Sequence, residues 1–254
     1  MSAFTKTERM YLQDTHLYEC SATIVGIDGE KGLVLSRTVF SPQGGGQPSD
    51  KGTIEAVESR KVWTVNLVKV VDGETIMHYV EDFGEDPPRA GTEVSVKIDK
   101  EFRTICSRLH SAGHALDKAM TNIGFPPERL KATKGHHFLD GPNVEYEIIG
   151  EALTPDEIAG IPPKLNSEMK VLVEADIETV VVQEMSKAEA LEKTGGREED
   201  MKGYPENLRM VSIAGLYIPC SGTHVKSSGE IGAVEITKAK KKKNTLKVSY
   251  VLSG

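Results

Sequence analysis

The sequence predicts an α+β protein in which a small β-barrel comes first and a mixed α+β domain follows. Short runs rich in β-branched residues, separated by turn-forming residues, fill the first hundred positions. A long segment with helical periodicity then begins after Asp99, and helical and strand-like segments alternate from there to the C-terminus. We therefore expect one domain over residues 1–98 and a second over residues 99–254.

Three runs carry the β prediction for the first domain. They cover residues 33–35, 62–71 and 94–98. Turn-forming pairs lie at positions 28–29, before the first of these runs, and at positions 72–73 and 87–88, between the second and the third. Several short strands at this spacing are typical of a small barrel or sandwich.

In the second domain the main predicted helix covers residues 100–123, with Asp99 as its N-cap and Gly124 after its end. One face should be buried, because apolar residues recur at helical spacing. These residues are Ile105, Leu109, Ala112, Leu116 and Ala119. Further helices are predicted over residues 155–159, 163–168 and 186–193, and strands over residues 171–183, 209–214, 233–238 and 246–252.

The composition is that of an ordinary globular protein, with 38% hydrophobic and 27% charged residues in a chain of 254. No apolar run is long enough to span a bilayer, and the first ten residues lack the features of a signal peptide. The three cysteines, Cys20, Cys106 and Cys220, do not suggest a disulfide framework. We expect a cytoplasmic protein without a membrane partner, and the sequence does not predict its oligomeric state.

A net charge of −7 argues against a protein that coats nucleic acid by bulk attraction. Lysines are nevertheless concentrated near the C-terminus, at Lys238 and at residues 240–243. One interpretation is a solvated hairpin turn between two strands. The other is contact with phosphate, for which Lys240, Lys241 and Lys242 are the candidate residues.

Two pairs of residues indicate a metal site. His110 and His114 are four apart in the predicted helix, so both imidazoles lie on one face. Cys220 and His224 flank a turn that contains glycine. Two imidazoles from a helix together with a thiolate and an imidazole from a loop form a natural tetrahedral zinc set.

Each pair alone also has an ordinary interpretation. His110 and His114 are equally compatible with one core and one surface histidine, and Cys220 with a small buried apolar residue. The adjacent His136 and His137 are interpreted as strand or loop residues, not as ligands. The helix lacks the glutamate of an H-E-x-x-H motif, which argues against a metallopeptidase.

A second motif lies at residues 38–50, where three glycines, Gly44, Gly45 and Gly46, follow one another. Consecutive glycines lose much conformational entropy on folding, so they suggest unusual backbone angles or the close approach of a ligand. A flexible connection between strands is the alternative. The lysine and serine of a phosphate-binding loop are absent from this motif.

These segments resemble alanyl-tRNA synthetase and the AlaX trans-editing proteins. Residues 38–50, with the sequence G-G-G-Q-P, resemble the glycine-rich motif of that family, residues 108–114 its H-x-x-x-H helix, and residues 220–225 its C-G-G-T-H-V loop. Residues 138–146 and 165–168 resemble its intervening segments. Three departures are Ser41 where tyrosine is usual, Ser111 where threonine is frequent, and Ser221 in place of glycine.

The resemblance implies a barrel that bears the glycine motif and an editing domain that bears zinc, without the domain for aminoacylation. It implies hydrolysis in trans of tRNA(Ala) charged with serine or glycine. Thr38 and Gln47 are candidates for recognising the serine hydroxyl at the catalytic site, with Gly44, Gly45 and Gly46 as substrate-binding residues. Editing of Ser-tRNA(Thr) and a non-catalytic, zinc-stabilised tRNA-binding module are the alternatives.

Four protein ligands make a closed site, which is typical of structural zinc, whereas catalytic zinc keeps one position open. The sequence alone does not decide between the two roles. His110, His114 and Cys220 are the firmer ligand assignments of the four.

Overall fold

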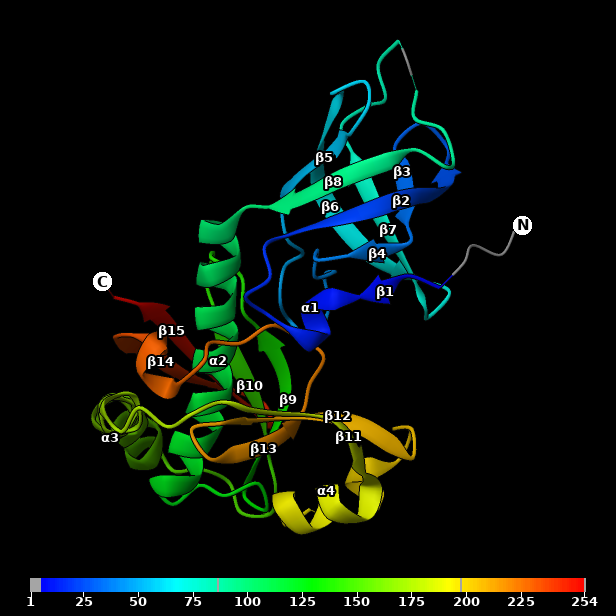
Figure 1. Cartoon of the computed structure of the whole chain (residues 1–254). Coiled ribbons are helices and arrows are strands. Elements are labelled where there is room, and N and C mark those ends of the chain that lie inside the picture. The colour runs from blue at the N-terminus through cyan, green and yellow to red at the C-terminus, as the bar shows by residue number, and fades with distance from the viewer. Residues whose placement is uncertain (1–5, 86, 197, 254) are drawn as a thin grey trace. The chain divides into compact units, whose positions relative to one another are not determined.

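The computed structural model describes residues 6–85, 87–196 and 198–253. The chain divides into two compact units, Met1–Ile105 and Cys106–Gly254. The division falls inside helix α2 (Lys100–Asn122), a few residues after the last barrel strand (Figure 1). The domain boundary expected after residue 98 stays a prediction.

Six strands of the first unit close into a β-barrel in the order β2-β3-β7-β6-β5-β8, and all neighbouring strands are antiparallel (Figure 1). Their bounds are β2 (Glu19–Asp28), β3 (Gly32–Leu35), β5 (Gly52–Ala56), β6 (Val62–Val71), β7 (Thr75–Val80) and β8 (Glu93–Ile98). Alternate side chains such as Trp63 and Val65 are buried inside the barrel. The predicted barrel and its three predicted strands are confirmed.

Close packing of backbone at the β5–β8 seam requires a glycine. Gly52 pairs with Ile98, and a Cβ atom at Gly52 would lie 2.2 Å from the carbonyl oxygen of Lys97. Two short strands outside the barrel, β1 (Glu8–Arg9) and β4 (Arg37–Thr38), pair in parallel, and helix α1 (Met10–Gln13) follows β1.

The second unit contains two antiparallel sheets. One has the order β14-β15-β10-β9, formed by β9 (Leu130–His136), β10 (Asn143–Ile148), β14 (Val234–Lys242) and β15 (Thr245–Leu252). The other has the order β11-β12-β13, formed by β11 (Val180–Ser186), β12 (Asn207–Ile213) and β13 (Leu216–Pro219). The remaining elements are helices α3 (Pro155–Glu174) and α4 (Lys187–Thr194) and the 3₁₀ turns η1 (Glu198–Met201) and η2 (Ser228–Ile231).

Helix α2 begins as predicted, since the backbone N–H of Phe102 donates to Asp99 Oδ1 at 3.0 Å. Side chains of α2, α3 and the four-stranded sheet form one core, to which α2 contributes Leu109 and Leu116. The burial predicted for Ile105 is wrong, because this side chain is 36% exposed. It lies one turn before Leu109, where the helix enters that core.

The two helices predicted over residues 155–159 and 163–168 form the single helix α3, and the predicted break is wrong. Pro162 and Pro163 lie inside it and remove backbone hydrogen bonds. Four side chains at helical spacing compensate for this loss by their burial. They are Ile161, Leu165, Met169 and Leu172.

The strand predicted over residues 171–183 is wrong in its first part. Val171 and Val173 belong to the last turn of α3, and β11 begins only at Val180. Alternating valines fitted a strand, but the buried Leu172 between them holds this segment in the helix. The predicted helix at residues 186–193 is confirmed as α4, which Ser186 caps through Glu189.

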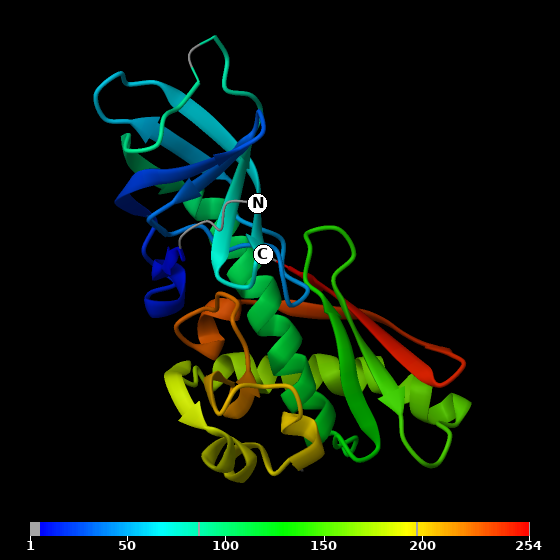
Figure 2. The same ribbon diagram turned by 90° about the vertical axis from the view of Figure 1, so that its right-hand side faces the viewer.

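The lysine-rich segment forms the end of the β14–β15 hairpin, which reaches away from α2 (Figure 2). Lys242 pairs with Thr245, and Lys243, with φ of +55°, makes the turn. The predicted hairpin turn is therefore confirmed, and contact of these lysines with phosphate stays a prediction. In the part of the chain that the structure describes, no helix has the length and apolar character needed to cross a membrane.

Candidate metal centre

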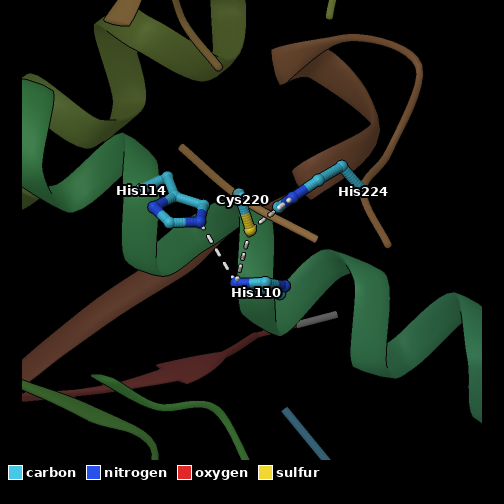
Figure 3. A group of neighbouring side chains, drawn as sticks. All are labelled: His110, His114, Cys220 and His224. Carbon is cyan, nitrogen blue, oxygen red and sulfur yellow. Dashed lines mark hydrogen bonds between the residues drawn. The ribbon is translucent and has the colours of Figure 1, made fainter. Parts of the chain in front are cut away.

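Four side chains of the second unit converge on one point: His110 and His114 from α2, and Cys220 and His224 from the loop after β13 (Figure 3). One ligand atom from each residue lies within 4.8 Å of the other three. The helix spacing and the loop spacing thus bring together the two pairs that are 110 residues apart in the chain.

Three of the six separations between these four atoms are close to those expected around a tetrahedral ion, and all six are within 4.8 Å. His114 Nε2 lies 3.1 Å from His110 Nε2, and Cys220 Sγ lies 3.6 Å from His110 Nε2 and 3.4 Å from His224 Nε2. Zinc bonds of about 2.05 Å to nitrogen and 2.3 Å to sulfur would separate two nitrogens by about 3.3 Å and nitrogen from sulfur by about 3.6 Å. The four residues therefore form a group that could hold a metal ion.

Burial favours neutral imidazoles in this cluster. It lowers the pKa of His114 to about 4 and holds the pKa values of His110 and His224 well below the usual range, with the neighbouring imidazoles adding to the effect. Burial also raises the pKa of the Cys220 thiol. Neutral imidazoles are metal ligands, and a bound cation would favour the thiolate form of Cys220.

Serines on the same face of α2 fix the loop that carries Cys220 and His224. Ser107 Oγ lies 2.8 Å from Thr223 Oγ1, and Ser111 Oγ accepts from the backbone N–H of Val225 at 3.2 Å. Ser111 Oγ also lies 3.3 Å from His224 Nδ1. Donation from Nδ1–H to Ser111 leaves Nε2 of His224 free for the ion.

Arg209 on β12 supports the same loop from the other side. Its Nη1 donates to the carbonyl oxygens of Cys220 at 2.5 Å and Gly222 at 3.4 Å. The backbone N–H of Gly222 in turn points to Cys220 Sγ at 3.4 Å. Arg209 was not predicted as a site residue, although the β12–β13 hairpin, in which Met210 pairs with Pro219, places it opposite Cys220.

His137 packs against the cluster without joining it. Its ring stacks on that of His110 with 5.0 Å between centroids, and its Nδ1 lies 2.7 Å from the hydroxyl of Tyr250. The ring fits between two glycines: a Cβ atom on either Gly113 or Gly135 would lie 2.2 Å from a ring atom. In the sequence, Gly113 in the middle of the predicted helix is the feature that could have indicated this packing.

Thr38 lies in the first unit, where its hydroxyl is hydrogen-bonded. Its Oγ1 is 2.8 Å from Nε2 of the buried His78 and accepts from the backbone N–H of Phe40 at 3.1 Å. His78 Nδ1 lies 3.1 Å from the carbonyl oxygen of Leu33. Thr38 is fully buried.

The glycine motif forms a closed loop in the first unit. Ser41 and Asp50 bridge its two ends by two hydrogen bonds. The backbone N–H of Ser41 donates to the side-chain Oδ2 of Asp50 at 2.6 Å, and the backbone N–H of Asp50 donates to the carbonyl oxygen of Ser41 at 3.0 Å. The guanidinium of Arg103, buried like the carboxylate of Asp50, pairs with it. Across the loop, the backbone N–H groups of Gly44 and Gln47 each donate to the carbonyl oxygen of the other residue.

Two of the three glycines adopt the left-handed conformations that the motif suggested. Gly45 has φ of +55° and Gly46 has φ of +81°. Gly44 and Gly45 are exposed, whereas the side chain of Gln47 is buried. The paired backbone of the loop argues against a flexible connection between strands.

Comparison with known proteins places this arrangement in a family. Residues 208–247, which include Cys220 and His224, match the threonyl and alanyl tRNA synthetase second additional domain. Over 243 residues the chain is 30% identical to the alanyl-tRNA editing protein AlaX-M of Methanosarcina barkeri, covering 93% of this chain and 94% of that protein. The chain belongs to the AlaX family of alanyl-tRNA editing proteins.

Two longer relatives each contain a segment that is similar to this chain. It is 31% identical over 248 residues to the AlaX-L protein of Pyrococcus horikoshii, covering 96% of this chain and 57% of that protein. It is 30% identical over 241 residues to the alanine–tRNA ligase of Methanothrix thermoacetophila, covering 94% of this chain. The chain spans only 24% of that ligase.

Proposed function

We propose that this AlaX protein hydrolyses the ester between serine and tRNA(Ala), in trans, and that it uses zinc held by His110, His114, Cys220 and His224. The observation that carries the proposal is the cluster of four ligand residues whose ligand atoms lie within 4.8 Å of one another. Two of these residues, Cys220 and His224, lie in the segment that matches the synthetase-associated domain. The names of the relatives, alanyl-tRNA editing proteins, support tRNA(Ala) as the carrier.

Serine on tRNA(Ala) is a chemically reasonable target. Serine is alanine with an added hydroxyl, and an apolar pocket discriminates against an added hydroxyl by only about 10²-fold. A second site that hydrogen-bonds this hydroxyl would accept serine and leave alanine with an unpaired partner. Glycine on tRNA(Ala) is a second proposed substrate.

Three imidazoles and one thiolate are a ligand set that suits zinc. When bound, zinc supplies Lewis acidity for the ester carbonyl or for water. Four protein ligands close the site, so a catalytic role requires that one of them dissociates or that a fifth position opens. Ser111 and Arg209 hold the loop in either case, because they contact Val225, His224 and Cys220 directly.

Thr38 is the residue that we propose for recognition of the serine hydroxyl, with Gln47 as a second candidate. Because Thr38 and Gln47 are both buried, the contact requires neighbouring side chains to move when substrate enters. We propose that the backbone at residues 44–46, of which Gly44 and Gly45 are exposed, contributes to substrate binding. Lys240 and Lys242, which are exposed, and Lys241 are proposed to contact tRNA phosphates.

A comparison of four charged tRNAs tests this proposal. Purified protein loaded with zinc is expected to release serine from Ser-tRNA(Ala), and glycine from Gly-tRNA(Ala), while it leaves Ala-tRNA(Ala) intact. Release from Ser-tRNA(Thr) at an equal rate would favour a broader serine-editing enzyme. If no tRNA is deacylated while zinc-loaded protein still binds tRNA, the protein is a non-catalytic binding module and the proposal fails.

A further inference from the structure

His137 is the first residue after strand β9, and its buried ring lies next to the metal cluster. The ring is nearer to His110, with 5.0 Å between the centroids and 29° between the planes, than to His114, whose centroid is 6.3 Å away. Two rings at the first distance and angle are stacked. His137 therefore covers one face of His110.

His110 occupies the centre of the cluster. Its Nε2 lies 3.1 Å from His114 Nε2 and 3.6 Å from Cys220 Sγ, and its ring centroid is 4.4 Å from that of His224. An imidazole offers its lone pair to a metal in the plane of the ring, so the orientation of the ring decides where Nε2 points. The plane of the His110 ring therefore determines whether all four ligands can reach one ion.

A chain of two hydrogen bonds fixes the orientation of His137. The hydroxyl of the buried Tyr250 donates to the carbonyl oxygen of Leu109 at 2.9 Å, so its proton is already used. His137 Nδ1 lies 2.7 Å from the same hydroxyl and must donate to it. Because Leu109 directly precedes His110, this chain joins the ring of His137 to the turn of α2 that carries the ligand.

Two glycines make room for the ring of His137. A Cβ atom at Gly113 would lie 2.2 Å from His137 Cε1, and a Cβ atom at Gly135 would lie 2.2 Å from His137 Nε2. Gly113 is in the interior of α2, where glycine is less favourable than alanine, and the packing of this ring gives a reason for its presence. The backbones of α2 and β9 hold the ring from two sides and leave it little room to turn.

We propose that His137 is a positioning residue of the metal centre, which fixes the plane of the His110 imidazole so that Nε2 points to the ion. The inference rests on the proposed function, because it takes the ion at this cluster to be zinc. A hydrogen bond with the backbone of Thr223 holds the His110 ring at another point. Removal of a group that orients a metal-bound histidine typically costs about 10–100-fold in metal affinity. His137 acts on the ligand by packing against its face.

The test compares zinc binding by the full-length wild type, His137→Ala, His137→Phe and Tyr250→Phe. His137→Phe keeps a flat ring against His110. Tyr250→Phe removes a single oxygen and so tests the same chain in a variant that keeps the packing. Leu165→Ala, in the core that α2 and α3 share, controls for the loss of a buried side chain.

The dissociation constant for zinc is measured by competition with a chelator. The visible absorption of the cobalt(II)-loaded protein reports the geometry of the ligands around the ion. Thermal unfolding of metal-free samples measures the stability of each variant separately.

We expect His137→Ala to raise the dissociation constant for zinc by about 10–100-fold and to change the cobalt spectrum, and Tyr250→Phe to raise the constant by a smaller factor. His137→Phe is expected to recover most of the affinity. Leu165→Ala is expected to lower the stability and to leave the affinity unchanged.

An unchanged dissociation constant in His137→Ala, or an equal loss of affinity in Leu165→Ala, would overturn the inference, and zinc-dependent serine release by the wild type would leave the proposed function standing. Conversely, the wild type could bind zinc, with the expected loss of affinity in His137→Ala, and release no serine. In that case His137 positions the ligand and the proposed reaction fails.

Discussion

The hydroxyl of Thr38 lies 2.8 Å from Nε2 of His78, and this contact determines whether Thr38 can donate or accept a hydrogen bond to a ligand. Burial lowers the pKa of His78 to about 4, so the ring is neutral near pH 7. Its Nδ1 faces the carbonyl oxygen of Leu33, which only accepts, and therefore Nδ1 carries the proton. Nε2 must then accept the hydroxyl proton of Thr38, which leaves Thr38 as an acceptor for any ligand.

A first prediction concerns the discrimination of serine from glycine. Thr38→Val is expected to lower the rate of serine release relative to glycine release by about tenfold, because it removes the acceptor for the serine hydroxyl. Glycine lacks that hydroxyl and serves as the internal reference. Deacylation of Ser-tRNA(Ala) and Gly-tRNA(Ala) is measured in parallel.

Thr38→Ser keeps the hydroxyl and controls for the change in shape. This variant is expected to retain the wild-type ratio of serine to glycine release. An equal loss of both activities in Thr38→Val would show that Thr38 is needed for folding of the barrel and not for recognition.

A second prediction concerns stability at acid pH. His78 has a folded-state pKa of about 4, lower than the unfolded value of about 6.5. Its contribution to the free energy of unfolding is therefore fully present above pH 6.5 and is lost as pH falls toward 4, up to about 3 kcal/mol. His78→Gln should make the free energy of unfolding less dependent on pH between pH 6.5 and pH 4.

Urea unfolding of metal-free wild type and His78→Gln between pH 7.5 and pH 4 measures the difference. The histidines of the cluster also have lowered pKa values, but they are present in both proteins and cancel in the comparison. Parallel stability curves for the two proteins would contradict the assignment of a neutral buried ring at His78.

A third prediction concerns the effect on stability of replacing glycine by alanine inside a helix. Glycine to alanine inside a helix usually stabilises a protein by about 1 kcal/mol. Gly160→Ala in α3 should follow this rule, since nothing lies within 4 Å of the added Cβ. Gly113→Ala in α2 should instead destabilise by about 1–3 kcal/mol, because the Cβ would meet the ring of His137 at 2.2 Å.

The double variant Gly113→Ala with His137→Ala removes the clash and should recover part of the stability lost in Gly113→Ala. Chemical denaturation of the three variants and the wild type gives the comparison. Stabilisation by Gly113→Ala alone would show that the ring of His137 is not held between Gly113 and Gly135.

The local features of this protein could be predicted where one periodicity dominates. The strand β6 was predicted from its concentration of β-branched residues, and helix α2 from apolar residues at helical spacing. The metal cluster could be predicted because four residues of strong ligand type occur at two short spacings. In these places local sequence and tertiary structure agree.

The remaining features depend on contacts between distant segments. Pro162 and Pro163 suggested a break, but the burial of one face of α3 outweighs it. His78 lies beside Thr38 through a contact between residues 40 apart in the chain. Arg209 lies beside the loop of Cys220 through the β12–β13 hairpin, whose second strand was not predicted.

The central claim is that the cluster of His110, His114, Cys220 and His224 holds the zinc required for hydrolysis. It is tested most directly by measuring zinc content and serine release on the same samples of wild type, before chelation, after chelation and after reloading. Cys220→Ala and His114→Ala are treated in parallel, with Cys20→Ala as the matched cysteine control. We expect one zinc ion per chain in the wild type and in Cys20→Ala, serine release that disappears and returns with the ion, and no release by either cluster variant. Serine release from Ser-tRNA(Ala) by protein shown to contain no metal would contradict this account.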